Sequence, residues 1–114
     1  MPAPGQVSWA YVPFVGKPGG KVRPVLVLGA SGGDASIVYG TTKGPDEKPN
    51  LHLVLALTAQ HPDSVRVRLW DDTFFYAENV RVIPVASFRE RVGYVSKHEL
   101  QRVVDELKEL DAMR

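Results

Sequence analysis

The sequence predicts a mainly β domain that ends in one helix. Short aromatic and β-branched stretches alternate with turn-forming Gly, Pro, Asn and Asp residues through most of the chain. The last stretch instead repeats its apolar residues with a helical period. Short strands followed by a helix are typical of a small curled sheet or barrel that the helix covers. At 114 residues the chain suffices for one domain and not for two, so we expect residues 1–114 to form a single domain.

The expected strands are short apolar segments bounded by turn residues. They span 6–14, 23–30, 36–42, 51–58, 65–70 and 80–88. Residues 71–79 are aromatic and fit either a loop or a short strand. Because proline has no N–H, Pro24 belongs at the first residue of a strand or on an edge, and Pro84 marks an edge or a bulge.

One expected strand has a distinctive pattern. Residues 65–70 alternate apolar and basic side chains, which predicts a half-buried strand with Arg66 and Arg68 on one side.

The helix is expected over residues 96–110. Ser96 is followed three residues later by Glu99, the spacing of a capping box at a helix N-terminus. The apolar residues that then fall on one face are Leu100, Val103, Val104, Leu107 and Leu110. This pattern predicts a helix that packs on the sheet.

The composition excludes several classes of protein. No run of about 18 apolar residues exists, and the N-terminus has no basic region followed by an apolar stretch. We therefore expect neither a membrane span nor a signal peptide. The chain has no cysteine, which removes disulfides, thiolate catalysis and cysteine metal sites and fits a cytoplasmic location.

Charge is distributed unevenly although the net charge is only +1. Up to residue 33 the only charged side chains are Lys17, Lys21 and Arg23, and Asp34 is the first acid. A local cationic loop can contact an anion on a nearly neutral protein. On charge alone, the simpler interpretation is a solvated loop.

Patterns for metal or cofactor binding are not found. His52, His61 and His98 have no partner at metal-ligand spacing, and neither a phosphate-binding loop nor a dinucleotide fingerprint occurs. The adjacent Asp71 and Asp72 are acids of a kind that can bind a divalent cation but more often solvate a turn. We expect no metal and no cofactor.

The chemistry that remains centres on Arg23. An arginine donates two parallel hydrogen bonds and keeps its charge, so it suits a phosphoryl transition state. Thr41 and Thr42 add hydroxyls, with Lys43 beside them. RNA can be cleaved without a metal when the 2′-hydroxyl attacks the adjacent phosphate, provided that the protein positions the phosphate and stabilises the developing charge.

Aromatic side chains could also contribute to RNA binding, because they can stack on unpaired bases. We expect most of them to fill the core and two or three to contact a ligand. The candidates are Trp9, Tyr11, Phe14, Trp70, Phe74, Phe75 and Tyr76.

These residues together resemble the MazF/PemK-type toxins of bacterial toxin–antitoxin systems. "PGQVSWAYVPF" resembles the first strand of the family, and "GGKVRPVLVL" its glycine-rich loop and Arg-Pro strand. "VYGTTK" resembles the third strand with its terminal hydroxyl pair, and "VRVIPVASFRERVGYVSKHE" the closing strand and final helix. The four parts occur in the family's order and cover most of the chain, more weakly from about residue 44 to 79.

The resemblance implies a small Src-homology-3-like barrel, of the MazF/PemK/CcdB type, that forms a homodimer. It implies a metal-independent endoribonuclease that cuts single-stranded RNA, including mRNA, at short motifs and leaves a cyclic phosphate and a 5′-hydroxyl. Arg23 would be the transition-state clamp and proton donor, and Thr41 the phosphate-orienting hydroxyl with Thr42 beside it. The RNA-binding candidates are Trp9, Lys17, Lys21 and Lys43. A cognate antitoxin would lay an acidic segment across the same groove.

Two departures from the family pattern concern the general base. Family members often have an acid after the first glycine, where this chain has Gln6, and many have a Glu in the loop that here spans 15–21 without an acid. The base is therefore unassigned. "LTAQ" also resembles the hydroxyl-bearing segment, which makes Thr58 an alternative to Thr41. We prefer Thr41 because its strand follows the Arg-Pro strand through a tight turn.

Two other functions compete with RNA cleavage. CcdB-type toxins share the barrel and inhibit DNA gyrase without cutting RNA, but they use a Trp-Gly-Ile C-terminus, and this chain ends "ELDAMR". The other alternative is a barrel that binds RNA or a peptide without chemistry.

Overall fold

A computed structural model describes residues 1–113 as one antiparallel sheet and a C-terminal helix. The sheet has six strands in the order β4-β5-β3-β2-β1-β6. The strands are β1 (Gln6–Pro13), β2 (Gly20–Ser31), β3 (Asp34–Thr41), β4 (Leu53–Leu57), β5 (Thr73–Pro84) and β6 (Phe88–Tyr94). Two 3₁₀ helices, η1 (Pro62–Val65) and η2 (Val85–Ser87), flank β5, and α1 (Lys97–Ala112) ends the fold.

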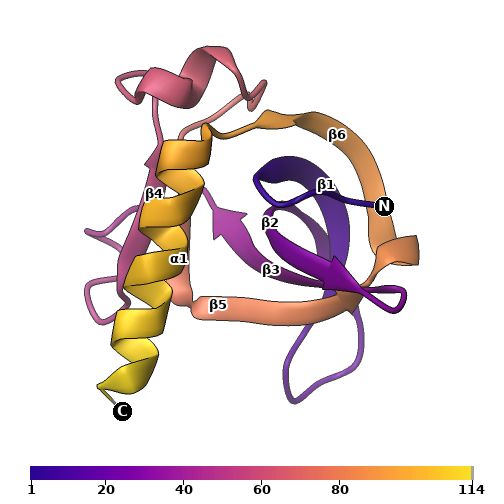
Figure 1. Cartoon of the computed structure of the whole chain (residues 1–114). Coiled ribbons are helices and arrows are strands. Elements are labelled where there is room, and N and C mark those ends of the chain that lie inside the picture. Colours follow the sequence, from indigo (N-terminus) through magenta and orange to yellow (C-terminus); the bar gives the residue numbers. More distant parts are fainter. Residues whose placement is uncertain (114) are drawn as a thin grey trace.

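The sheet curls into an open barrel, and α1 lies along the β4 side of it (Figure 1). The segment before β5 links the curl to β6, because Val67 bridges to Gly93 and the Arg68 N–H donates to the Val92 carbonyl at 3.0 Å. Gly93 has φ +153°, and a Cβ there would lie 1.9 Å from the Arg66 carbonyl oxygen. Only glycine fits where the chain crosses so closely.

The core has two parts, one on each face of the sheet. The first is formed with α1, whose fully buried Val103 packs with Leu100 and Leu107 against the sheet. The second lies on the opposite face and contains Ala10, Val12, Val25, Val27, Ala35, Ile37 and Ile83. The apolar helix face that the sequence predicted is thus confirmed as the packing face.

The predicted mainly β fold with a C-terminal helix is confirmed, and so is the helix cap. The Ser96 hydroxyl accepts a hydrogen bond from the Glu99 N–H at 3.2 Å. In the described part of the chain no helix is long and apolar enough to cross a membrane.

The strand predicted over residues 65–70 is wrong. Pro62 starts η1, which His61 caps by accepting from the Asp63 N–H at 2.9 Å. Arg66 and Arg68 are exposed on either side of the buried Val67, as the alternation indicated. The pattern reports one buried contact and not a strand, because β4 and β5 pair directly with each other.

Strand β6 was not predicted, and the ambiguous residues 71–79 belong largely to a strand. Residues 88–94 include three consecutive charged side chains and have Val92 as their one buried residue, so they show little apolar signal. They are an edge strand whose register on β1 shifts twice. Strand β5 is long because its aromatic first half pairs with β4 on one side and with the end of β3 on the other, and its second half pairs with β3 up to Pro84.

Candidate functional site

The site lies where β2 and β3 separate. Their pairing begins at Val25 and Tyr39 and runs away from this point. Residues 20–24 pair with β1, whereas Gly40 and Thr41 pair with Phe75 and Phe74 of β5. The two strands therefore diverge and leave an opening between Arg23 on one side and Thr41 on the other.

Pro24 occupies the start of this opening. It lies inside β2 and not at its first residue, but it precedes the residues that pair with β3. Its missing N–H thus falls on a free stretch of strand edge, as the sequence predicted.

Two pockets meet at the opening. The larger, of about 380 Å³, is called here the aromatic pocket because Trp9 and Trp70 line it. The smaller, of about 210 Å³, is called the lysine pocket because Lys43 and Lys48 line it. The residues that line both are Lys21, Arg23, Thr41 and Thr42. The arginine and both threonines that the sequence singled out thus lie at the junction of the two pockets.

The lysine pocket is strongly cationic. Lys21, Arg23, Lys43 and Lys48 line it, and within residues 1–113 no acidic side chain does. A concentrated positive field of this kind attracts a polyanion even though the whole chain carries a net charge of only +1.

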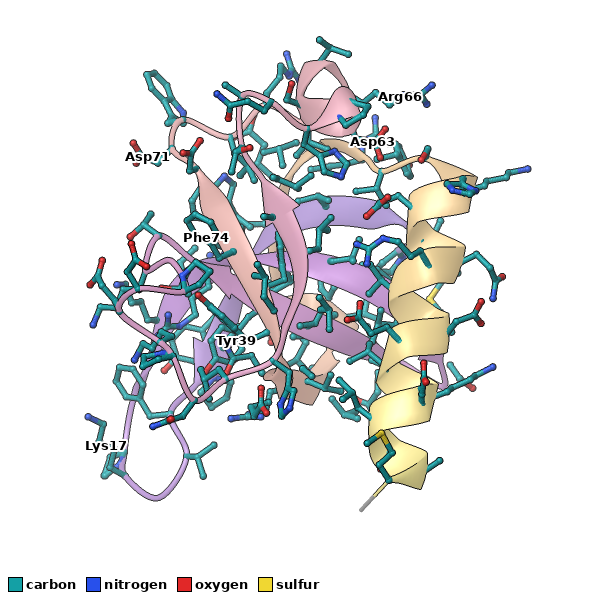
Figure 2. All side chains as sticks on the ribbon, turned by 90° about the vertical axis from the view of Figure 1, so that its left-hand side faces the viewer. Lys17, Tyr39, Asp63, Arg66, Asp71 and Phe74 are labelled. Atoms are coloured by element: carbon teal, nitrogen blue, oxygen red, sulfur yellow. The ribbon has the colours of Figure 1, made fainter. Side chains whose placement is uncertain are left out.

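The aromatic pocket combines apolar walls with one carboxylate. Trp70 is 95% exposed and Trp9 is half-buried, so both rings are accessible. Asp71 is the one acid among the described residues that line this pocket. The Thr73 hydroxyl donates to the Asp71 backbone carbonyl at 3.0 Å, a bond that does not use the carboxylate. Figure 2 shows Asp71 at the edge of the molecule away from α1.

The turn after β3 is fixed by hydrogen bonds. The Thr41 hydroxyl accepts from the Lys43 N–H at 3.2 Å, and the Tyr76 hydroxyl donates to the Lys43 carbonyl at 2.8 Å. Burial, and then the charge of Glu47, raises the pKa of Tyr76, so this phenol stays a donor. Thr41 uses an acceptor position here, and its own O–H stays available to a ligand.

Tyr39 lies beneath two guanidinium groups. The Arg23 Cζ lies over its ring at 4.8 Å from the centroid, and the Arg81 Cζ at 5.6 Å. Both distances are in the range of a cation–π interaction.

The other predicted RNA-binding residues are placed differently. Trp9 lines the aromatic pocket and Lys43 the lysine pocket. Lys17 lies in the loop between β1 and β2 with its Nζ 4.7 Å from the centroid of the Phe14 ring, and Figure 2 shows it at the far end of this side. Thr58 follows the end of β4 and is not among the described residues that line either pocket.

Several site residues were not predicted as such. Lys48 and Asn79 lie in a polar loop and at mid-strand, where residue type alone gives no signal. For Tyr39 the sequence did give a signal, because Tyr39 stands two residues before Thr41 in the same strand and so lies on the same face as Thr41. Asp71 was interpreted, with Asp72, as an acid that can bind a divalent cation but more often solvates a turn, and not as part of this site.

The histidines lie outside the two pockets, within the range that the structure describes. His52 Nδ1 is 2.7 Å from Glu78 Oε2. Burial raises the pKa of Glu78, but its hydrogen bonds with His52 outweigh this and lower it. His61 Nε2 is 3.5 Å from Glu99 near the start of α1. Among residues 1–113, no three potential ligands from His, Asp and Glu are grouped so that they could hold a metal ion.

Comparison with protein families gives one match. The family described as "PemK-like, MazF-like toxin of type II toxin-antitoxin system" matches residues 3–110. A search of curated protein sequences gives no match.

Solved structures share the fold. The chain is similar to MazE–MazF from Deinococcus radiodurans, with 20% identity over 99% of this chain and 98% of that one and a TM-score of 0.69. It is also similar to an endoribonuclease in complex with its cognate antitoxin from a mycobacterial species, with 18% identity over 95% of this chain and 90% of that one and a TM-score of 0.59. A third similar structure is the Mycobacterium tuberculosis toxin MazF-mt6, with 17% identity over 90% of this chain and 93% of that one and a TM-score of 0.59. These likenesses confirm the predicted barrel type.

Proposed function

Because the chain belongs to the family of PemK-like, MazF-like toxins of type II toxin–antitoxin systems, as its motifs predicted, we propose that it is an endoribonuclease of single-stranded RNA. The observation that carries the proposal is the position of Arg23, Thr41 and Thr42 at the junction of a cationic and an aromatic pocket. A mycobacterial protein of the same fold is called an endoribonuclease and is bound to its cognate antitoxin. An mRNA substrate places the activity in the cytoplasm.

The reaction is an attack of the 2′-hydroxyl on the adjacent phosphate. The bond between the 2′-oxygen and phosphorus forms, and the bond between phosphorus and the 5′-oxygen breaks. Arg23 donates to the phosphate oxygens and stabilises the extra negative charge, and the Thr41 O–H, with Thr42 beside it, orients the phosphate. The 5′-oxygen takes a proton from Arg23, which regains one from solvent. The products are a 2′,3′-cyclic phosphate and a 5′-hydroxyl.

For the general base we assign Asp71. A base must accept the proton of the 2′-hydroxyl, and the side chains of Lys21 and Arg23 are hydrogen-bond donors. Of the described residues that line the aromatic pocket, Asp71 alone carries a carboxylate. It would thus take the role left open by Gln6 and by the loop 15–21. The proton returns from Asp71 to solvent after the step.

The two pockets support a path for the RNA strand. Backbone phosphates would contact Lys21, Lys43 and Lys48, and an unpaired base would stack in the aromatic pocket on Trp9 and Trp70. The aromatic pocket's volume of about 380 Å³ is within the roughly 300–1,000 Å³ usual for small-molecule sites. Lys17 would contact the strand only beyond this region.

The same cationic opening suits an acidic protein segment. We propose that a cognate antitoxin inhibits the enzyme by laying such a segment over Lys43 and Lys48, in competition with RNA. We also propose a homodimer, which would add buried area to the small core.

The test is cleavage of a long mixed-sequence RNA in the presence of a chelator. We expect the unmodified protein to cut at one short motif and to leave 5′-hydroxyl ends. Arg23→Ala should abolish cleavage, and Arg89→Ala, at an exposed residue of β6, should not. Uncut RNA, or cleavage that the chelator stops, would contradict the proposal.

A second substrate tests the nucleophile. A strand with a single 2′-deoxynucleotide at the cut site should stay intact, because it lacks the attacking hydroxyl. If the protein binds RNA tightly but cuts neither strand, a binding barrel explains the result better than an enzyme does.

A further inference from the structure

We infer that Tyr39 is a positioning residue for Arg23, and that Arg81 supports the Tyr39 ring from the neighbouring strand. The inference rests on the proposed function, because it gives Arg23 its role at the phosphate. It concerns how the protein holds a free guanidinium in place at the opening between β2 and β3.

The strand register places the three side chains together. Val25 of β2 lies opposite Tyr39 of β3, and Arg23 is two residues before Val25 on the same face. On the other side of β3, Ile37 lies opposite Arg81 of β5, and Tyr39 is two residues after Ile37. Tyr39 is therefore the diagonal neighbour of both arginines, at a spacing that long and aromatic side chains can span.

The observed contacts follow from this register. The ring centroid of Tyr39 lies 4.8 Å from the Arg23 Cζ and 5.6 Å from the Arg81 Cζ. Tyr39 and Arg23 both line the lysine pocket, whereas Arg81 is not among the described residues that do. Arg23 is therefore within reach of a ligand in the pocket, and Arg81 contacts the ring without lining the pocket.

Arg81 is itself held in place. Its Nη1 donates to the Glu78 carbonyl at 3.1 Å and to the Val80 carbonyl at 2.8 Å. Its Nε is buried and has no hydrogen-bond partner in residues 1–113. The electron-rich face of the Tyr39 ring attracts the guanidinium and so offsets part of the free energy lost by burying this donor without a hydrogen bond. The arginine and the ring thus fix each other.

An aromatic ring suits this task better than a carboxylate. Lys21, Lys43 and Lys48 line the same pocket as Arg23, so repulsion would drive an unsupported guanidinium out into solvent. A carboxylate would hold it, but would occupy the N–H groups that the phosphate needs and would cancel its charge. A guanidinium over a ring is attracted through its face and keeps its in-plane N–H donors for the phosphate.

Two variants of Tyr39 separate the ring from the hydroxyl. Tyr39→Phe keeps the ring, and Tyr39→Leu removes it at similar apolar bulk. We expect Tyr39→Leu to lower the single-turnover cleavage rate about tenfold, the effect of roughly 1.4 kcal/mol, and Tyr39→Phe less than about threefold. Affinity for an uncleavable 2′-deoxy-substituted strand should change less than about threefold in either, because the lysines remain.

The matched control is Tyr94→Leu. Tyr94 lies on β6, away from the opening, with the Arg91 Cζ over its ring at 5.3 Å and the Arg91 Nη1 donating to its hydroxyl at 3.0 Å. It should leave the cleavage rate unchanged. Tyr39→Phe as slow as Tyr39→Leu, or Tyr39→Leu as fast as the unmodified protein, would overturn the inference.

A measurement without RNA separates this inference from the proposed function. The ring should shift the NMR signal of the Arg23 Nε–H, a shift that Tyr39→Phe keeps and Tyr39→Leu loses. An unchanged signal in Tyr39→Leu would overturn the positioning of Arg23 even if RNA is cleaved. A lost shift in a protein that cuts no RNA would support the positioning and refute the proposed function alone.

Discussion

Removing one cation from the lysine pocket should weaken the salt dependence of RNA binding by a defined amount. The pocket is lined by Lys21, Arg23, Lys43 and Lys48. If each neutralises one phosphate, the release of counterions from a single strand contributes about 0.7 per contact, which gives a slope of about −2.8 for log K against log salt. Lys48→Ala should reduce the slope to about −2.1.

The difference is large enough to measure. Between 50 and 200 mM salt, affinity should fall about 50-fold for the unmodified protein and about 20-fold for Lys48→Ala. Fluorescence anisotropy with an uncleavable 2′-deoxy-substituted strand gives both values. Lys97→Ala, at an exposed residue in the first turn of α1, is the control and should keep the full slope. Equal slopes for Lys48→Ala and Lys97→Ala would refute the lysine pocket as the phosphate path.

Three further predictions concern the base, the helix start and the closure of the barrel. Asp71→Asn should lower the cleavage rate by about 10²–10⁴-fold while Asp72→Asn does not, and similar rates for the two would remove Asp71 as the base. The hydrogen bond from Arg102 lowers the pKa of Glu99, although burial opposes this. The ionised Glu99 therefore adds to the free energy of unfolding above the unfolded-state pKa of about 4.3, and this contribution should be lost as pH falls through the lower pKa of the folded state. Urea midpoints from pH 6 to 3 should show this loss, which is smaller in Glu99→Gln. Gly93→Ala should reduce the free energy of unfolding by about 2 kcal/mol or more, because its Cβ would clash with backbone; an unchanged urea midpoint would contradict this.

Much of the fold was predictable because the buried elements carry strong local patterns. The strand around Val25 and Val27 is a continuous apolar run, and α1 is indicated by the Ser96 cap and one apolar face. Strand β6 was missed because an edge strand is selected for its pairing with β1 and not for burial. The strand predicted over residues 65–70 was wrong for the opposite reason. Val67 is buried by a single bridge to Gly93, which gives an alternating pattern without strand pairing.

The candidate site was predictable only in part. Arg23 and Thr41 are close in sequence, on consecutive strands, so a hairpin brings them near each other. Asp71 lies just before β5 and Arg81 within it, and β5 pairs with β3 across more than thirty intervening residues. Such non-local pairing leaves no mark in the local sequence, and only the register shows which side chains meet.

The position of Asp71 also bears on why the glycine-rich loop can be free of acids. Asp71 lines the aromatic pocket, and within the described residues it does not line the lysine pocket. An acid in the loop 15–21 would stand close to Lys21 and reduce the field that attracts the phosphates. Asp71 comes just before β5 and lines the aromatic pocket together with Lys21 and Arg23, and among the described residues no acid lines the lysine pocket. Under the proposed function, the pocket that would take the phosphates stays cationic, and the proposed base lies in the pocket that an unpaired nucleotide would enter.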